Sequence, residues 1–194
     1  MSTATLPETP STVGDDELFE VIDGQRVRMP PMAALSVWIA FELARHLANV
    51  ASVNVGRAVT EMLFQLPPPI NRGRRPDVAL VSYERWARQR PIPYLGNAWH
   101  VVPNLAGEVV SPSDNVDELQ DKIADYFRAG VELVWIIFPA QRQIHVYQSL
   151  TRITVLTQDD TLDGGAVVPD FRLPLADLLT PIEDAETNGK ELPR

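Results

Sequence analysis

Residues 107–139 read GEVVSPSDNVDELQDKIADYFRAGVELVWIIFP. The pattern predicts a strand, an amphipathic helix and a second strand that is apolar on both faces. Ser113 or Asp114 can cap the start of this helix, and Gly130 ends it. Such a βαβ unit has two parallel strands joined by a right-handed connection. The buried stripe of the helix is expected to hold Val116, Leu119, Ile123, Tyr126 and Phe127.

Two acidic residues stand at apolar strands about thirty positions apart in the chain. Glu108 lies inside an apolar run, where an unpaired carboxylate costs several kcal/mol, and Asp77 opens the short strand 78–81. If the strands are neighbours, the two carboxylates repel each other unless they share a proton or a cation. Oxygen ligands favour a hard ion such as Mg²⁺ or Mn²⁺. The alternative for Asp77 is that Pro76-Asp77 forms an ordinary turn.

Lys122 is the only lysine of the predicted domain, since the other lysine, Lys190, lies near the end of the chain. At helical spacing it falls between Leu119 and Tyr126, on the border of the apolar stripe. A compact ammonium with a tunable pKa suits a role in activating water or contacting phosphate. The alternative is a lysine that extends to solvent beside Asp125 or Glu118.

Composition limits the classes of protein to consider. The chain has 194 residues with 45% hydrophobic content, which predicts one domain with a sizeable core. The absence of cysteine excludes disulfides and thiolate metal sites. No apolar run approaches the roughly 20 residues of a membrane span. Because the first residues also lack a signal-peptide pattern, a cytoplasmic protein without membrane contact is expected.

The formal net charge of −9 argues against a nucleic-acid partner, but the charge is unevenly distributed. Segment 71–90 is rich in arginine and includes Arg72, Arg74 and Arg75, which are candidates for binding nucleic-acid phosphates. The alternative is that these arginines only contact solvent.

The remaining chain supplies further elements of one domain over residues 17–181. Residues 1–16 are expected to be disordered, and residues 182–194 form a tail. A hairpin is predicted at Leu18–Met29 around Asp23-Gly24. A second antiparallel hairpin, 143–148 with 152–156, is expected at a sheet edge.

A helix is also predicted at Met32–Val50, covered on most of its circumference. Within it, Glu42 and His46 lie four positions apart and can face each other. They either form a surface pair, or Glu42 contributes to the site.

Several segments taken together resemble the Uma-two family of restriction-endonuclease-like proteins, within the PD-(D/E)XK nuclease superfamily. The resemblance covers about residues 17–180. It rests on FEVIDGQRVRMPP, PDVALV, EVVSPSDNVDELQDKIADYFRAGVELVWII, RQIHVYQS and VVPDFRLPLADLL.

The resemblance implies an α/β fold of mixed α+β type, with a central mixed sheet flanked by helices and preceded by the hairpin. It implies that Asp77, Glu108 and the backbone carbonyl of Val109 hold the metal. The superfamily's lysine is expected at position 110, where this chain has Val110. Similar family members carry a lysine on the following helix, which corresponds to Lys122. Tyr126, one turn further on, either lies at the edge of this site or belongs to the core.

The function implied is Mg²⁺- or Mn²⁺-dependent hydrolysis of DNA phosphodiester bonds by Asp77, Glu108 and Lys122. One alternative is a binding or structural protein whose nuclease activity has lapsed, which Val110 and the acidic charge favour. Another is a homodimeric assembly module that pairs through an edge strand such as 143–148.

Overall fold

The computed structural model describes residues 17–93, 97–112 and 114–179. The predicted disordered segment 1–16 and the predicted tail 182–194 lie outside the described residues. A six-stranded sheet in the order β10-β9-β8-β7-β6-β3 forms the centre of the fold. Its strands are β3 (Gly56–Thr60), β6 (Val78–Ser82), β7 (Leu105–Val109), β8 (Leu133–Phe138), β9 (Gln143–Ser149) and β10 (Arg152–Leu156). Strands β7 and β8 are parallel and the other pairs are antiparallel, which confirms the predicted mixed sheet and βαβ unit.

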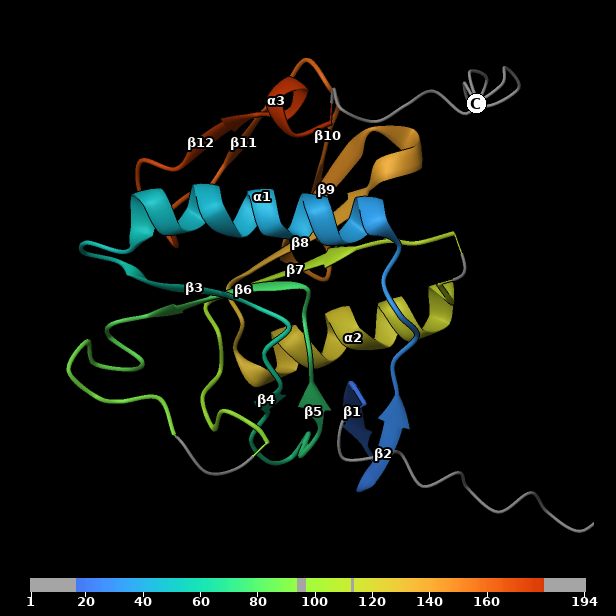
Figure 1. The fold of residues 1–194 in the computed structure, drawn as a ribbon, viewed down its shortest axis with the longest axis vertical. Coiled ribbons are helices and arrows are strands. Elements are labelled where there is room, and N and C mark those ends of the chain that lie inside the picture. The colour runs from blue at the N-terminus through green and yellow to red at the C-terminus, as the bar shows by residue number, and fades with distance from the viewer. Residues whose placement is uncertain (1–16, 94–96, 113, 180–194) are drawn as a thin grey trace, which may run out of the picture.

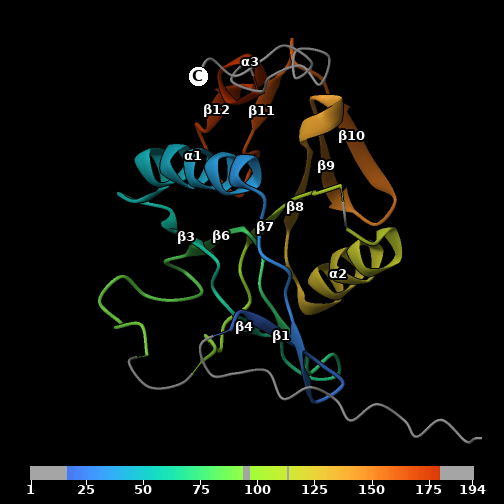
Figure 2. The ribbon, with the colours of Figure 1, turned by 45° about the vertical axis from the view of Figure 1, so that its right-hand side comes forward.

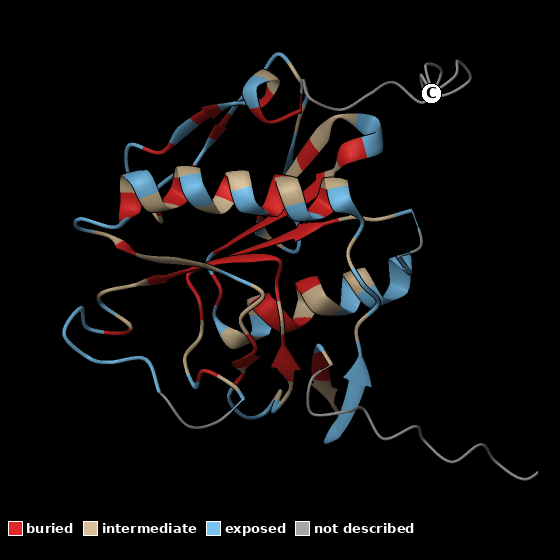
Figure 3. Ribbon diagram, in the orientation of Figure 1, coloured by how far each residue is buried: buried red, intermediate tan, exposed pale blue. Residues whose placement is uncertain are grey.

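The two long helices cover opposite faces of this sheet (Figures 1 and 2). Alternate residues of each strand point to opposite faces, so Leu105 and Val109 pack in the core under α1 (Ala34–Ala51), whereas Ala106 packs under α2 (Val116–Ala129). Figure 3 shows the buried residues concentrated in the sheet and on the inner sides of both helices. The core under α1 is extended by β11 (Thr161–Asp163), β12 (Arg172–Pro174) and α3 (Leu175–Leu179).

The first helix is covered on most of its circumference, as predicted. Its buried side includes Ile39, Leu43 and Leu47, and further apolar side chains are partly buried against the same core. Phe41 is the exception among the predicted apolar residues, with 58% of its surface exposed. No second layer packs over it among the described residues.

Helix α2 begins and ends with recognisable caps. The side chain of Asn115 accepts hydrogen bonds from the backbone N–H of Asp117 at 2.8 Å and of Glu118 at 3.4 Å. Asp114 instead accepts from the Ser111 N–H, so the predicted cap at Asp114 is wrong, and Ser113 lies outside the described residues. Gly130 ends the helix with a φ of +97°, as predicted, because glycine adopts this conformation without steric cost.

The predicted stripe of α2 is confirmed except at its first residue. Ile123 and Tyr126 are buried, and Leu119 and Phe127 pack against them. Val116 is 71% exposed, because the first turn of α2 extends beyond the sheet.

A second, four-stranded sheet in the order β2-β1-β5-β4 carries the predicted N-terminal hairpin. The hairpin consists of β1 (Phe19–Ile22) and β2 (Gln25–Arg28), joined by a turn at Asp23-Gly24 in which both residues have positive φ. Strand β5 (Gly73–Arg74) pairs with β1 and with β4 (Phe64–Gln65). This sheet brings Glu20 of β1 close to α2, where it contacts Lys122.

The second hairpin is confirmed, and it lies at an edge of the six-stranded sheet, as predicted. Strand β9, reached from β8 through a short 3₁₀ turn (Pro139–Gln141), lies between β8 and β10 and is an interior strand. An interior strand has no free edge, so the proposal of dimer pairing through 143–148 is wrong. The edge strands are β10 and β3. No helix in the described part of the chain is long and apolar enough to cross a membrane.

Candidate active site

The antiparallel register of β6 and β7 brings the two predicted acids together. Val78 lies opposite Gly107, so Asp77 and Glu108 follow as the next pair. Both residues are buried, with 6% and 5% of their surface exposed. Asp77 Oδ2 accepts a hydrogen bond of 2.6 Å from the backbone N–H of Val109. No described residue bonds its second oxygen, Oδ1.

Lys122 reaches the acids from α2. Its Nζ lies 3.4 Å from Glu108 Oε2 and 3.2 Å from Glu20 Oε1. The alternative in which Lys122 lies beside Asp125 or Glu118 is therefore wrong. Tyr126, one turn further along α2, is fully buried and donates a hydrogen bond of 2.5 Å to Glu108 Oε1. It belongs both to the core and to the site.

A buried ion network supports this arrangement from the side of the small sheet. The Arg74 guanidinium, which is 2% exposed as a residue, bonds Glu20 at 2.7 Å and Asp125 at 2.6 Å. Glu20 also accepts from the backbone N–H of Arg75 at 3.0 Å. Because Glu20 in turn contacts Lys122, Arg74 positions the lysine through the carboxylate of Glu20.

This network corrects the prediction for the arginines. Arg74 cannot bind a phosphate, since it is buried and its donors are used by carboxylates of the same chain. Arg75 is half-buried and donates to the backbone carbonyls of Phe19 and Glu61. Arg72 pairs with Asp23 and Asp125, both at 3.1 Å, and stays partly exposed at the site. Of the three, only Arg72 lies where a ligand phosphate could reach it.

Glu42 is not brought to the site. It lies on α1 and forms an ion pair of 2.6 Å with Arg45, while His46 Nε2 is 3.9 Å away. Glu42 therefore belongs to a surface pair, and its closer partner is Arg45 rather than His46.

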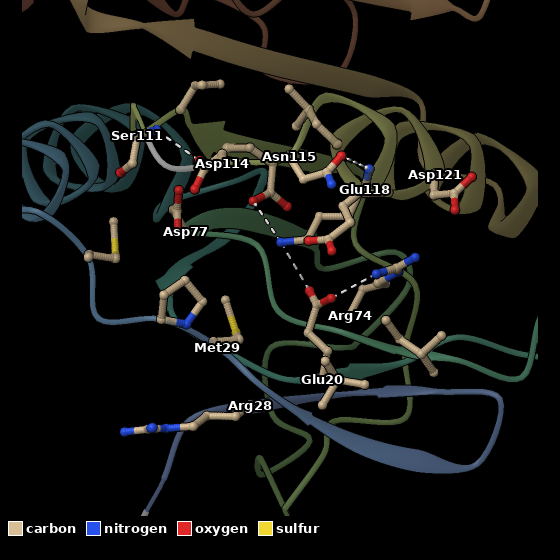
Figure 4. A pocket seen from close by; sticks show the side chains of 18 of the residues that line it. Glu20, Arg28, Met29, Arg74, Asp77, Ser111, Asp114, Asn115, Glu118 and Asp121 are labelled. Carbon is tan, nitrogen blue, oxygen red and sulfur yellow. Dashed lines mark hydrogen bonds and ion pairs between the residues drawn. The ribbon is translucent and has the colours of Figure 1, made fainter. Parts of the chain in front are cut away.

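The acids and the lysine open into a cavity of about 480 Å³. Figure 4 shows Asp77, Glu20 and Arg74 at its inner wall, Arg28 and Met29 on the hairpin side, and Asn115, Glu118 and Asp121 on the α2 side. Val109 and Val110 also line it, so Val110 faces the space where the superfamily places its lysine. Lys122 supplies the positive charge there instead.

Burial shifts the pKa values of both strand acids upward. It raises the pKa of Asp77 to about 7, although the Val109 N–H acts to lower it. Burial also raises the pKa of Glu108 to about 7, partly offset by the charge of Lys122. Burial tends to lower the pKa of Lys122, but the carboxylates of Glu108, Glu20 and Asp77 raise it above its usual value. Lys122 therefore remains an ammonium ion at neutral pH.

These shifts predict how stability depends on pH without a cation. In EDTA, the free energy of unfolding should fall as pH rises from about 4 to about 7, by a few kcal/mol. In this window the folded state holds protons on Asp77 and Glu108 that the unfolded state has released, so raising the pH favours unfolding. Urea unfolding at several pH values measures this slope, and the double variant Asp77→Asn/Glu108→Gln should flatten it. An unchanged slope in the double variant would contradict the assignment of the shifts to these two groups.

The donor set fits a hard divalent cation. One oxygen of the Asp77 carboxylate has no hydrogen-bond partner among the described residues, Glu108 keeps unused lone pairs, and the Val109 backbone adjoins both. At 3.4 Å, the Lys122–Glu108 contact is longer than a short charge-assisted hydrogen bond, so the ammonium does not fully occupy Glu108. Within the described ranges, however, no three His, Asp or Glu side chains are placed to bind one ion directly.

The sequence interpretation missed Glu20, whose carboxylate contacts both Lys122 and Arg74. Glu20 lies between apolar neighbours in LFEVI. This is the same signal, an acid in an apolar run, that identified Glu108.

Comparison with solved structures places the fold in a known class. A crystal structure from Anabaena variabilis, described as a "putative nuclease belonging to DUF820", matches with a TM-score of 0.73 and 20% identity over 90% of this chain and 93% of that chain. A structure described as "DrdV-DNA complex" matches 71% of this chain and 10% of that chain at 19% identity, with a TM-score of 0.37. The chain therefore shares the fold of the Anabaena variabilis protein.

The sequence comparison then identifies the family. Residues 5–176 match the Uma2 family, described as "Putative restriction endonuclease", and the chain belongs to this family. None of the curated proteins matches the chain.

Proposed function

We propose that the protein is a metal-dependent endonuclease that hydrolyses DNA phosphodiester bonds. The observation that carries the proposal is the convergence of Asp77, Glu108 and Lys122 in one cavity of a nuclease fold. Asp77, Glu108 and the carbonyl of Val109 would hold Mg²⁺ or Mn²⁺. When bound, such an ion polarises the phosphate and lowers the pKa of a coordinated water.

The side chains of the site have separate tasks in this proposal. Tyr126 fixes the orientation of Glu108 through its short hydrogen bond. Lys122, held between Glu20 and Glu108, carries a permanent positive charge into the cavity. It stabilises the negative charge that develops on the phosphate oxygens and orients the attacking water. Because its pKa is raised, it does not act as a general base.

Phosphates flanking the cleaved bond need cations at the mouth of the cavity. Arg28 and Arg72 line it, and Arg28 is largely exposed beside Glu17. Contacts to phosphates make binding dependent on salt and carry little sequence information.

The test is cleavage of supercoiled plasmid and of single-stranded DNA by the parent and by variants of Lys122. The parent should nick DNA with Mg²⁺ or Mn²⁺ and not with EDTA. Lys122→Ala should be slower by about a hundredfold or more, because a charge aimed at the transition state is lost. Lys122→Arg should stay impaired, since a planar guanidinium does not replace a compact ammonium between two carboxylates.

The matched control is Arg128→Ala, which removes an exposed cation from the same helix and should cleave at the parent rate. Circular dichroism confirms that each variant is folded. No cleavage by a folded parent with any metal would overturn the proposal. That result would favour the alternative hypothesis of a binding protein whose nuclease activity has lapsed, which the valine at position 110 suggests.

A homodimer is a separate proposal. The edge strand β10 exposes Ile153 and Val155, which is the kind of surface that pairs between subunits. Sedimentation velocity of the full chain measures whether the dimer exists.

A further inference from the structure

Glu61 carries a buried carboxylate without a partner. Neither of its oxygens is exposed to solvent, and neither has a hydrogen-bond partner within the described residues. Among the residues that the structure describes, the only other buried side-chain nitrogen or oxygen atoms in this condition are the indole nitrogens of Trp99 and Trp135. Arg75, the cation whose charge acts most strongly on Glu61, donates to the backbone carbonyl of Glu61 and not to its carboxylate. Because buried polar groups are almost always hydrogen-bonded, a buried carboxylate without a protein partner is expected to bind an ion or a water.

The pairing of β3 with β6 brings the backbone of Glu61 next to Asp77. Thr60 lies opposite Val78, and Glu61 is the next residue after this pair. The backbone N–H of Glu61 indeed donates to the Asp77 carbonyl at 3.3 Å. Asp77 is in turn opposite Glu108 by the register of β6 and β7. Glu61 follows the last residue of β3 with a φ of +53°, so the hydrogen bond from its backbone N–H, and not a regular sheet register, holds it next to Asp77.

The charges of the site act on this carboxylate. Burial raises the pKa of Glu61 most, Arg75 lowers it, Glu108 raises it and Lys122 lowers it. The pKa of Asp77 is in turn raised by Glu61. The carboxylate of Glu61 therefore interacts electrostatically with the charged groups of the site, although no hydrogen bond joins its side chain to the other acids among the described residues.

We propose that Glu61 is a third carboxylate of the cation site, which contacts the ion held by Asp77 and Glu108 through a water of its coordination shell. The inference rests on the proposed function. Contact through water follows from the finding that no three acids of the described segments are placed to ligate one ion directly. Mg²⁺ suits this arrangement, because it retains several of its waters when bound to protein. Glu61 is thus a positioning residue for the ion, and the partner of its carboxylate is the coordinated water.

The test is calorimetric titration of the full chain with Mg²⁺ and with Mn²⁺ in the absence of DNA. Glu61→Gln should weaken the affinity for the ion by roughly 10- to 100-fold, the usual effect of losing an outer ligand. Thermal unfolding gives a second readout. In EDTA, Glu61→Gln should unfold at a higher temperature than the parent, because the unpaired charge is removed. The rise in melting temperature on adding the metal should be smaller than in the parent.

Glu84→Gln, the same substitution at an exposed site, is the control and should behave as the parent in both measurements. Glu61→Ala keeps the test available if the glutamine variant does not fold. Parental ion affinity in Glu61→Gln, with binding lost in Asp77→Asn, would overturn this inference and leave the proposed function standing. A parent that binds neither ion, or an Asp77→Asn variant that binds as the parent does, would overturn the proposed function and this inference together.

Discussion

Glu108→Gln and Asp77→Asn are each expected to slow metal-dependent DNA cleavage by about a thousandfold or more. Each substitution removes a carboxylate proposed to hold the ion, and the ion contributes several kcal/mol of transition-state stabilisation. Since each 1.4 kcal/mol corresponds to about a factor of ten in rate, the loss reaches roughly three powers of ten. Plasmid nicking under single-turnover conditions measures it, with the metal concentration varied to separate weak binding from slow chemistry.

Both variants should remain folded, because amides have nearly the shape of the acids they replace and carry no buried charge. At about pH 8 in EDTA they should be at least as stable as the parent, as the raised pKa values of about 7 require. Asp159→Asn, an exposed acid in the turn after β10, is the matched control and should cleave at the parent rate. Parental cleavage by either folded site variant would show that the acids do not hold the metal.

Arg74→Met is expected to destabilise the fold by about 3 kcal/mol or more, although Arg74 touches no substrate. The substitution leaves Glu20 and Asp125 buried without their closest cation, and breaking a buried ion pair on one side costs about 3 to 5 kcal/mol. For a chain of this size, that is a fall of roughly 10 °C in melting temperature. Thermal unfolding followed by circular dichroism measures it.

The control for Arg74 is Arg128→Ala, which removes another cation of Asp125. That arginine is 67% exposed and lies 3.9 Å from Asp125, so its loss should change stability by less than about 0.5 kcal/mol. The triple variant Arg74→Met/Glu20→Gln/Asp125→Asn should recover part of the loss, because it removes the uncompensated charges. A melting temperature of Arg74→Met equal to that of the parent would show that the network does not stabilise the fold.

The local sequence pattern was sufficient to predict the secondary-structure elements around the site. The βαβ unit, both hairpins and the end of α2 at Gly130 follow from periodicity and turn residues, which act between near neighbours in the chain. The pairing of Asp77 with Glu108 was also predictable, because an acid at an apolar strand has few favourable environments. The helix cap was not predictable to the residue. Asp114 and Asn115 are both good caps, and the competing bond from Ser111 to Asp114 decides between them.

The roles of the charged residues depended on contacts between distant parts of the chain. The sequence of an arginine-rich segment does not distinguish side chains that contact solvent from those that bind DNA or pair with buried acids. Arg74 pairs with Glu20 and Asp125, which lie more than fifty positions away on either side in the chain. Likewise, only the strand order shows that 143–149 is interior, and only the pairing of β3 with β6 brings Glu61 next to Asp77.

By itself, then, the sequence determined the elements, the acid pair and the border position of Lys122, because these depend on local spacing and on the cost of burying charge. The tertiary structure decided which partner each charge has. Ion pairing depends on distances of a few ångströms between segments far apart in the chain, and those distances exist only once the two sheets and α2 have packed together.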